Sequence, residues 1–342
     1  METTKKTQAS HTGGRSARFG GYVKLFIILG VELSIFSIFA PYFATPRNIA
    51  NILRQVAEIG MMTVPLTLLL ISGYMDLSVG SILGLSGVIT GMLMRDGFGI
   101  PIALLAGVAA GVAVGLLNGY LIGGLKIQGV VVTIGTQVMI RGLCYIITQG
   151  RAVSGYPQEF FIINKAVLGI PISVLVWLAL SGVAILILEK SYIGRSIKAI
   201  GNNQNTALYS GVHVTRYQVL LFTFCGFVTS IASIFLIGRI SSAEATLGAG
   251  YELDVITAAL LGGVSIMGGS GTLQGAMLGI VIIGVLRNGL NMMGMSVIYQ
   301  SIILGVLLLI AVAQRGHARS VGMLPAGKAG LHRSTKNKGG RT

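Results

Sequence analysis

Apolar stretches separated by short polar connectors fill the sequence from residue 22 to residue 314. A helix of about 20 such residues crosses the roughly 30 Å hydrocarbon core of a bilayer, where the backbone must satisfy its own hydrogen bonds. Only 10% of the residues are charged, against about 25% in soluble domains. We therefore predict an all-α, polytopic membrane protein with about ten transmembrane helices and short, glycine-rich interrupted segments.

The expected spans differ in length, and two of them are short. They cover residues 23–44, 59–71, 79–94, 100–122, 130–148, 168–188, 217–237, 255–267, 273–293 and 297–313. At about 1.5 Å per residue, the stretch 59–71 alone cannot cross a bilayer. We therefore expect its helix to begin earlier, within the amphipathic stretch 48–58.

Lysine and arginine residues gather at the two ends of the chain, which has a net charge of +15. Such cations resist translocation, so both termini are predicted to be cytoplasmic and the number of spans even. Residues 1–21 and 315–342 are predicted to be basic, disordered cytoplasmic tails around a transmembrane domain of residues 22–314. Neither tail interleaves aromatic residues with its cations, so the charge does not indicate nucleic-acid binding.

The longest polar segment between apolar stretches covers residues 189–216. It contains four cations, Lys190, Arg195, Lys198 and Arg216, which favour a cytoplasmic location. Asn202 and Asn203 are candidate helix caps, residues 204–210 are compatible with a short helix, and Gly211 is placed for a left-handed turn. On composition alone, the segment is either a docking surface or a solvated linker.

Small residues recur with a spacing of four in the stretch 100–122 and just beyond it. They are Ala103, Gly107, Gly111, Gly115, Gly119 and Gly123. On a helix this spacing forms one ridge without bulky side chains, which lets a neighbouring backbone approach closely. Asn118 lies beside the ridge, and an amide at membrane depth needs a hydrogen-bond partner or water.

Two similar connectors rich in glycine and serine lie in the two halves of the chain, at residues 72–81 and 262–272. Each follows a short apolar stretch. Interrupted segments in corresponding positions form the mid-membrane pathway of inverted-repeat transporters. Close helix packing through glycine is the alternative explanation, and both interpretations stay open.

Polar side chains at membrane depth are the candidates for a solute pathway. The candidates are Asp76, Ser78, Asn118, Thr133, Thr136, Arg141, Asn288 and Asn291. Arg141 is expected to face protein or water, because an intramembrane charge is costly. The acids cluster at span ends, which leaves few for ion coupling, whereas hydroxyl and amide groups suit a neutral polyhydroxylated solute. The energy for transport is therefore expected to come from outside this chain.

Catalytic and metal-binding patterns are lacking in the sequence. It has no H-E-x-x-H motif, its four histidines lie in the tails and in the segment 189–216, and Cys144 and Cys225 fall inside apolar stretches. A near match to a phosphate-binding loop places Ala329 where serine or threonine must reach magnesium. We therefore expect no enzyme, no metal site and no cofactor on this chain.

Four blocks of sequence resemble the ribose-type branch of ABC-transporter permeases, which import simple sugars and autoinducer-2. The first is D-L-S-V-G-S at 76–81, and the second is T-I-G-T at 133–136 together with Arg141 and Gly142. The third, within 194–211, contains G-R, A-I-G-N and S-G. The fourth, within 252–271, contains E-L-D and five further glycines. In order and spacing the blocks cover roughly residues 50–310.

The resemblance implies an inner-membrane permease subunit for a small sugar-like solute. The implied partners are a cytoplasmic ATPase that holds ATP and magnesium, a periplasmic solute-binding protein, and a second permease copy or a sister permease. It further implies that the segment 189–216 docks on the ATPase. The residues that match this coupling role are Gly194, Arg195, Gly201, Asn202, Asn205, Ala207 and Gly211. The alternatives are a secondary carrier or facilitator that acts without an ATPase, and a membrane scaffold or receptor component.

The chain departs from the family pattern in three places. Asn205 stands where the Glu-Ala-Ala-x-x-x-Gly element has its acid, which puts a salt bridge to the ATPase in doubt. Gln128 and Gly129 replace the usual prolines before the fifth span. Tyr74 and Met75 lie ahead of Asp76, where glycine and isoleucine are more usual, so their bulk bears on nearby solute contacts.

Overall fold

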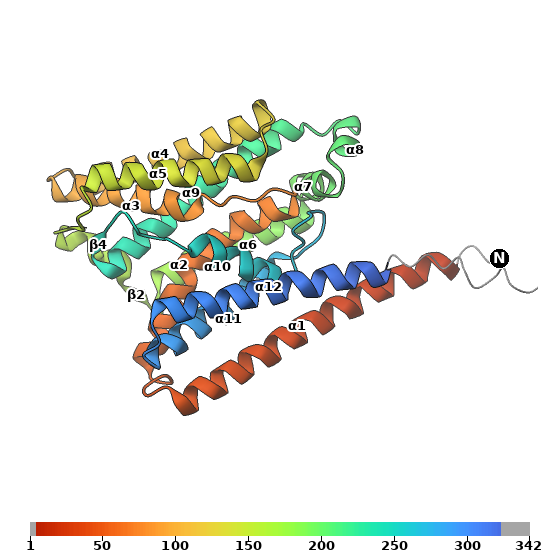
Figure 1. Cartoon of the computed structure of the whole chain (residues 1–342), viewed down its shortest axis with the longest axis horizontal. Coiled ribbons are helices and arrows are strands. Elements are labelled where there is room, and N and C mark those ends of the chain that lie inside the picture. The colour runs from red at the N-terminus through yellow and green to blue at the C-terminus, as the bar shows by residue number, and fades with distance from the viewer. Residues whose placement is uncertain (1–4, 323–342) are drawn as a thin grey trace, which may run out of the picture.

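The computed structural model describes residues 5–322, with side chains described for residues 20–313. Within these residues it is almost entirely helical, with four strands of two residues each. Figure 1 shows the long helices lying side by side along the longest axis of the molecule. The predictions for the two tails, residues 1–21 and 315–342, fall largely outside the residues whose side chains are described, and they stay predictions.

Each of the ten expected stretches contains a described helix. These are α1 (Lys5–Phe39), α2 (Pro46–Ile71), α3 (Val79–Arg95), α4 (Ile100–Gly119), α5 (Gly129–Thr148), α6 (Ile172–Lys190), α9 (Val214–Ile240), α10 (Tyr251–Leu261), α11 (Leu273–Met292) and α12 (Val297–Gly322). Seven of the described helices are long and apolar enough to cross a membrane. Shorter apolar helices accompany them, which confirms the all-α polytopic fold.

The remaining described elements are short. They are the π-helical turn η1 (Tyr120–Gly124), the 3-10 helix η2 (Gln158–Asn164), helices α7 (Tyr192–Asn202) and α8 (Gln204–Tyr209), and strands β1 (Val153–Ser154), β2 (Ala166–Val167), β3 (Ile170–Pro171) and β4 (Ser242–Ala243). Antiparallel pairs form between β1 and β4 and between β2 and β3.

The second span begins where the sequence predicts, because α2 includes the whole amphipathic stretch. Thr45 caps this helix by accepting a hydrogen bond from the backbone N–H of Asn48 at 3.3 Å, and Pro46 occupies its first turn. The eighth span differs from the prediction. Helix α10 ends at Leu261, so at about 1.5 Å per residue it extends only ~16 Å. The expected continuation to residue 267 is wrong, because Gly263 already adopts a φ of 100°.

Helix α2 lies at the centre of the bundle, where it packs against α6, α9, α10 and α11. Figure 1 shows α3, α4, α5 and α9 on one side of it and α1, α11 and α12 on the other. Helix α1 contacts α11 at the periphery and leaves apolar side chains such as Phe26, Ile38 and Phe39 exposed. Such a surface suits contact with lipid.

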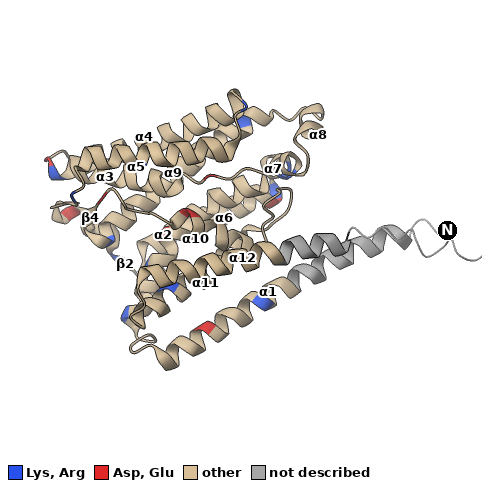
Figure 2. Ribbon diagram, in the orientation of Figure 1, with Lys and Arg blue, Asp and Glu red and all other residues tan. Residues whose placement is uncertain are grey.

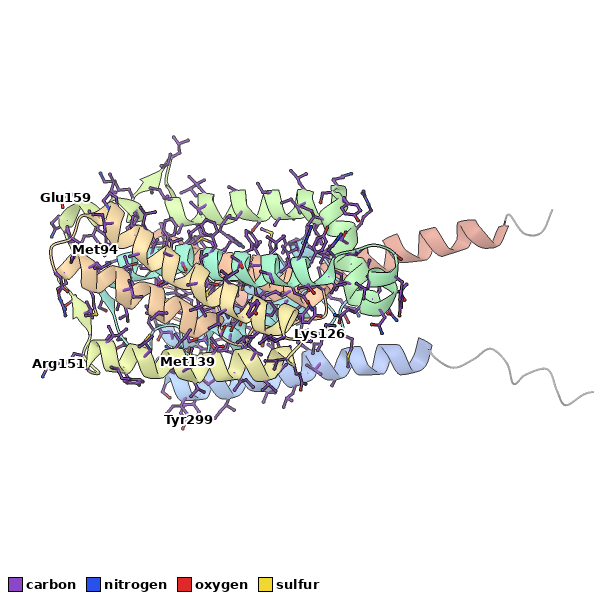
Figure 3. All side chains as sticks on the ribbon, turned by 90° about the horizontal axis from the view of Figure 1, so that it is seen from above. Met94, Lys126, Met139, Arg151, Glu159 and Tyr299 are labelled. Carbon is purple, nitrogen blue, oxygen red and sulfur yellow. The ribbon has the colours of Figure 1, made fainter. Side chains whose placement is uncertain are left out.

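The two ends of the bundle are different. Helices α7 and α8 form one end, while the β1–β4 pair joins residues 153–154 to 242–243 at the other (Figure 1). Most of the described charged residues lie near the ends (Figure 2). Figure 3 likewise places Arg151 and Glu159 at the strand end and Lys126 towards the helical end. The connectors that contain β1 and β4 therefore lie together, at the end opposite the segment 189–216.

From Gly111 onwards the small-residue ridge of α4 packs against α9, as its spacing predicts, while Gly107 meets Ser86 and Thr90 of α3. A Cβ atom added to Gly119 would lie 2.7 Å from the Cα atom of Val219. One added to Gly111 would lie 2.9 Å from the carbonyl oxygen of Gly226, and Gly123 contacts the start of α9 in the same manner. Larger side chains would therefore separate the two backbones.

Candidate functional site

A chain of buried hydrogen bonds joins the connector 72–78 to helices α4 and α5. The Oδ1 atom of Asp76 accepts hydrogen bonds from the backbone N–H and the hydroxyl of Ser78, at 2.8 and 2.6 Å. Asn118 donates to the Ser78 Oγ atom at 2.9 Å and accepts from the hydroxyl of Thr136 at 2.7 Å. These four side chains, which we call the polar cluster, are at most 5% exposed.

The sequence places each member of the polar cluster for a local reason. Gly73, with a φ of 83°, lets the chain turn after α2, and Ser78 directly precedes α3. Asn118 stands beside the α4 ridge, so its amide meets the connector and α5 at close range. Thr133 lies one turn before Thr136, but its hydroxyl donates within α5, to the carbonyl of Gly129 at 3.0 Å.

Polar groups further along α5 hold the turn that precedes α10. Arg141 donates through Nη1 to the carbonyls of Ala245 and Leu247, at 2.7 and 2.8 Å. Gln137 donates to the Oε1 atom of Glu252 at 3.0 Å. The expectation that Arg141 faces protein is confirmed, and its contacts are with backbone rather than with the polar cluster.

The two asparagines of α11 lie apart from the polar cluster. Asn288 exchanges amide hydrogen bonds with Asn48 of α2, at 2.8 and 3.1 Å. Asn48 lies in the first turn of α2, about 35 Å along the helix from Ile71 at 1.5 Å per residue, and the connector that carries Asp76 follows Ile71 in the sequence. Asn291 is exposed on the surface of α11. The structure therefore does not bring these two pathway candidates to the others.

Two ion pairs link helices inside the bundle, and sequence reasoning missed both pairings. Glu58 of α2 accepts two hydrogen bonds from Arg239 of α9, at 2.7 and 2.8 Å. Asp254 of α10 pairs with Arg287 of α11 at 2.7 Å. Both carboxylates are buried. Their charges are matched by arginines, which agrees with the expectation that few acids are available for ion coupling.

The segment 189–216 folds as two short helices. Asn203 caps α8 by accepting from the backbone N–H of Thr206 at 2.9 Å, and Gly211 has a φ of 84°. These two predictions are confirmed. Helix α7 was not predicted separately, although Ser191 caps it by accepting from the N–H of Gly194 at 3.2 Å.

The α7–α8 pair has its own small core and an exposed polar surface. Ala207 and Ile200 are buried together with Val212 and Val214. Asn205 and Arg195 are exposed, and the Arg195 guanidinium lies 5.9 Å from the centre of the Tyr192 ring. The segment is thus a folded unit, not an extended linker.

The two glycine-rich connectors meet each other and the end of α7. Gly269 donates its backbone N–H to the carbonyl of Ile71 at 2.8 Å. A Cβ atom added to Gly268 would lie 2.8 Å from Gly73 and 2.9 Å from the carbonyl oxygen of Gly201, and one added to Gly201 would collide with the carbonyl of Ile71. We call this contact the glycine junction. Close packing therefore accounts for these glycines, while the pathway interpretation stays a prediction.

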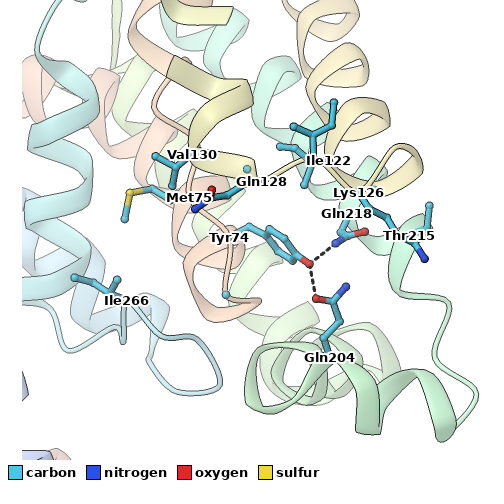
Figure 4. A pocket seen from close by; sticks show the side chains of 14 residues that line it. Tyr74, Met75, Ile122, Lys126, Gln128, Val130, Gln204, Thr215, Gln218 and Ile266 are labelled. Carbon is cyan, nitrogen blue, oxygen red and sulfur yellow. Dashed lines mark hydrogen bonds between the residues drawn. The ribbon is translucent and has the colours of Figure 1, made fainter. Parts of the chain in front are cut away.

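A cavity of about 460 Å³ lies beside the glycine junction, at the end of the bundle formed by α7 and α8 (Figure 4). Inside it the hydroxyl of Tyr74 donates to Gln204 of α8 at 3.1 Å and accepts from the amide of Gln218 of α9. Gln128 and Gly129 also line it. Two of the three departures from the family pattern therefore face one cavity. The residues involved are far apart in the sequence, so the sequence alone did not indicate that they meet.

Residues 48–312 match the family described as "Branched-chain amino acid transport system / permease component". The chain belongs to this permease family. Among similar proteins, the ribose import permease protein RbsC of Bacillus subtilis (strain 168) is 36% identical over 80% of this chain and 85% of its own length. The L-arabinose transport system permease protein AraH of Escherichia coli (strain K12) is 36% identical over 81% of this chain and 84% of its own.

A further relative is the L-arabinose ABC transporter permease protein AraH of Azospirillum brasilense. It is 35% identical over 77% of this permease and 77% of its own length. No solved structure matches the permease. The resemblance drawn from the four sequence blocks is confirmed, and the permease is a multi-pass membrane protein with a transport role.

Proposed function

We propose that the permease is the membrane-spanning subunit of an ATP-driven importer for a small neutral sugar. The observation that carries this proposal is the polar cluster, in which hydroxyl and amide groups from Ser78, Asn118 and Thr136 are buried inside the helical bundle. Such groups recognise hydroxylated solutes by hydrogen bonds. The named relatives, which are import permeases for ribose and L-arabinose, support the same class of solute.

The proposal includes partners that supply energy and solute. A separate cytoplasmic ATPase, which holds ATP and magnesium, docks on the α7–α8 pair, whose surface presents Arg195 and Asn205. A periplasmic binding protein delivers the sugar at the strand end, and a second permease copy or a sister permease completes the pathway. The protein lies in the inner membrane with both termini in the cytoplasm, as the basic ends favour.

The glycine junction supplies the mechanical link in this proposal. Helix α7 contacts both connectors through Gly201, and one of those connectors leads directly into Asp76 and Ser78 of the polar cluster. Because the backbones touch without intervening side chains, movement of α7 displaces the connectors with it. A shift of the docked α7–α8 pair is thereby converted into a change at the polar cluster, as in other rigid-body transitions.

The experiment that tests the function begins with purification of the permease from its native membrane in detergent. The co-purifying chains are identified, and the complex is reconstituted into liposomes with radiolabelled D-ribose or L-arabinose and the binding protein. We expect a stoichiometric ATPase and sugar accumulation that requires ATP. Ion-gradient-driven uptake by the permease alone would instead establish the secondary carrier. A complex that moves neither sugar would refute the proposed solute class.

A further inference from the structure

The cavity beside α8 shares its walls with the polar cluster. Tyr74 and Met75 directly precede Asp76, and Ile122 lies one helical turn beyond Asn118. Val130 also lines the cavity, and it lies at the start of α5, the helix that contributes Thr136 to the polar cluster. The connector, the end of α4 and α5 therefore line both the buried cluster and the cavity. The cavity lies where a solute leaving the cluster towards the α7–α8 end would arrive.

The lining chemistry of the cavity suits an uncharged solute with many hydroxyl groups. Five of the lining side chains offer amide or hydroxyl groups, and they come from four parts of the chain: Tyr74, Gln128, Gln204, Thr215 and Gln218. Among the described residues that line the cavity, Lys126 is the one with a charged side chain, and none is acidic. Met75, Ile122 and Ile266 add apolar surface, and the volume falls within the range of small-molecule sites, about 300–1,000 Å³.

The cavity is reachable from the α7–α8 end and closed towards the bundle. Gln128, Gln204 and Thr215 are exposed, whereas Gln218 is only 4% exposed. The Tyr74 hydroxyl is held between the exposed Gln204 and the buried Gln218 (Figure 4). One wall thus belongs to α8, so movement of the α7–α8 pair changes the opening of the cavity.

We propose that this cavity binds a small neutral sugar on the cytoplasmic side and is the site from which the importer releases its solute. The inference rests on the proposed function, because it adds a second solute site to the pathway that begins at the polar cluster. In this site Tyr74 is a positioning residue for Gln204 and Gln218, whose amides bind the sugar hydroxyls. Breaking the Tyr74–Gln204 hydrogen bond opens the site when α8 moves.

Protection of an introduced cysteine tests the proposal directly. Both native cysteines, Cys144 and Cys225, are fully buried, so an exposed cysteine can be labelled selectively. The Gln128→Cys permease, in its complex and in inside-out vesicles, is treated with a membrane-impermeant maleimide with and without D-ribose or L-arabinose. We expect one of these sugars to slow labelling at least about threefold, which corresponds to a concentration of twice its Kd.

Three further variants keep the test decisive. Lys24→Cys is exposed on α1, outside both the cavity lining and the segment 189–216, so sugar should leave its labelling rate unchanged. Thr215→Cys repeats the measurement from another wall if Gln128→Cys fails to assemble. Adding Tyr74→Phe to the Gln128→Cys chain removes one hydroxyl, and we expect the sugar concentration for half protection to rise about fivefold, as for one lost hydrogen bond.

The outcomes separate this site from the proposed function. Absence of protection at both cavity positions by either sugar, in a complex that transports one of them, overturns the release site and leaves the importer intact. Protection at the cavity together with no ATP-driven accumulation retains the site and refutes the importer. Equal protection of Lys24→Cys would show a general effect of sugar on labelling and would also overturn the proposal.

Discussion

Asn118 is a single residue on which three elements depend. Its amide nitrogen donates to Ser78 and its oxygen accepts from Thr136, both inside the bundle. A buried donor or acceptor without a partner costs about 1–3 kcal/mol. The need for such partners was predictable from an amide beside an apolar ridge, whereas the identity of the partners was not, because Ser78 is forty residues away in the sequence.

The first prediction compares two asparagines. Replacing Asn118→Ala leaves the Ser78 and Thr136 hydroxyls without this shared partner, and we expect a loss of about 1–3 kcal/mol in stability together with strongly reduced sugar uptake. Asn291→Ala is the matched control, because Asn291 is exposed, and its effect should stay within about 0.5 kcal/mol. Thermal unfolding of the purified protein in detergent measures both. Equal losses of stability in the Asn118→Ala and Asn291→Ala proteins would contradict the structural role of the polar cluster.

The second prediction concerns the ion pair between α2 and α9. Glu58→Gln leaves the partly buried Arg239 without its charge partner, and removing one member of a buried pair costs about 3–5 kcal/mol. Asp96→Asn breaks the exposed pair with Arg95, where both side chains are 46% exposed, and should cost less than about 1 kcal/mol. The measurement is the yield of monodisperse protein and its unfolding temperature. A Glu58→Gln protein as stable as Asp96→Asn would show that the pair is dispensable.

At the scale of elements, apolar length and residue spacing predicted most of the helices correctly. The ridge of α4 and the caps of α8 follow from local rules, so they could be read from the sequence. Helix α7 and the early end of α10 were not predicted, although Ser191 and Gly263 are local signals for them. The fit of glycines between backbones could not be read from the sequence, because it depends on tertiary contacts. Gly201 is an example, because only its contact with Ile71 explains why a side chain there would push α7 away from the end of α2.

The third prediction tests the packing of α4 against α9. Gly115→Val places atoms where the Phe222 backbone lies, so the two helices must separate and stable protein should be lost. Gly182→Ala in α6 has open space around it, and we expect unchanged or slightly higher stability there. Size-exclusion profiles in detergent and unfolding temperatures distinguish the variants. A monodisperse Gly115→Val protein of normal stability would show that the ridge is not a packing surface.

At the scale of the whole molecule, the important feature is the connection from the α7–α8 pair at one end, through the glycine junction, to the polar cluster inside the bundle. The sequence resemblance predicted a docking segment, yet it placed the connectors 72–81 and 262–272 in separate halves. Their meeting at α7 depends on the folded arrangement of α2, α7 and α10. The cavity that contains Tyr74 and Gln128 likewise arises from tertiary contacts between elements far apart in the chain.

The fourth prediction separates docking on the ATPase from transmission to the bundle. Gly211 lies at an exposed tip with a φ of 84°, where a side chain strains the local turn but a Cβ atom has nothing within 4 Å, so Gly211→Trp should abolish ATPase association without unfolding the bundle. Gly201→Ala disturbs the glycine junction instead, and we expect the ATPase to bind while ATP-driven uptake falls at least about tenfold, a coupling change of ~1.4 kcal/mol. Co-purification and uptake are measured on both. Normal uptake by Gly211→Trp with normal ATPase binding would refute docking at this segment.

The packing of α4 against α9 also bears on how the chain is made. Val219 follows Gly119 by 100 residues, and ribosomes add about 5–20 residues per second. Helix α4 is therefore complete about 5–20 s before the helix that covers its bare ridge. During that interval the part of the ridge that α9 later covers, at Gly111, Gly115 and Gly119, lacks its partner helix, so the order of synthesis makes this seam one of the late contacts of membrane assembly.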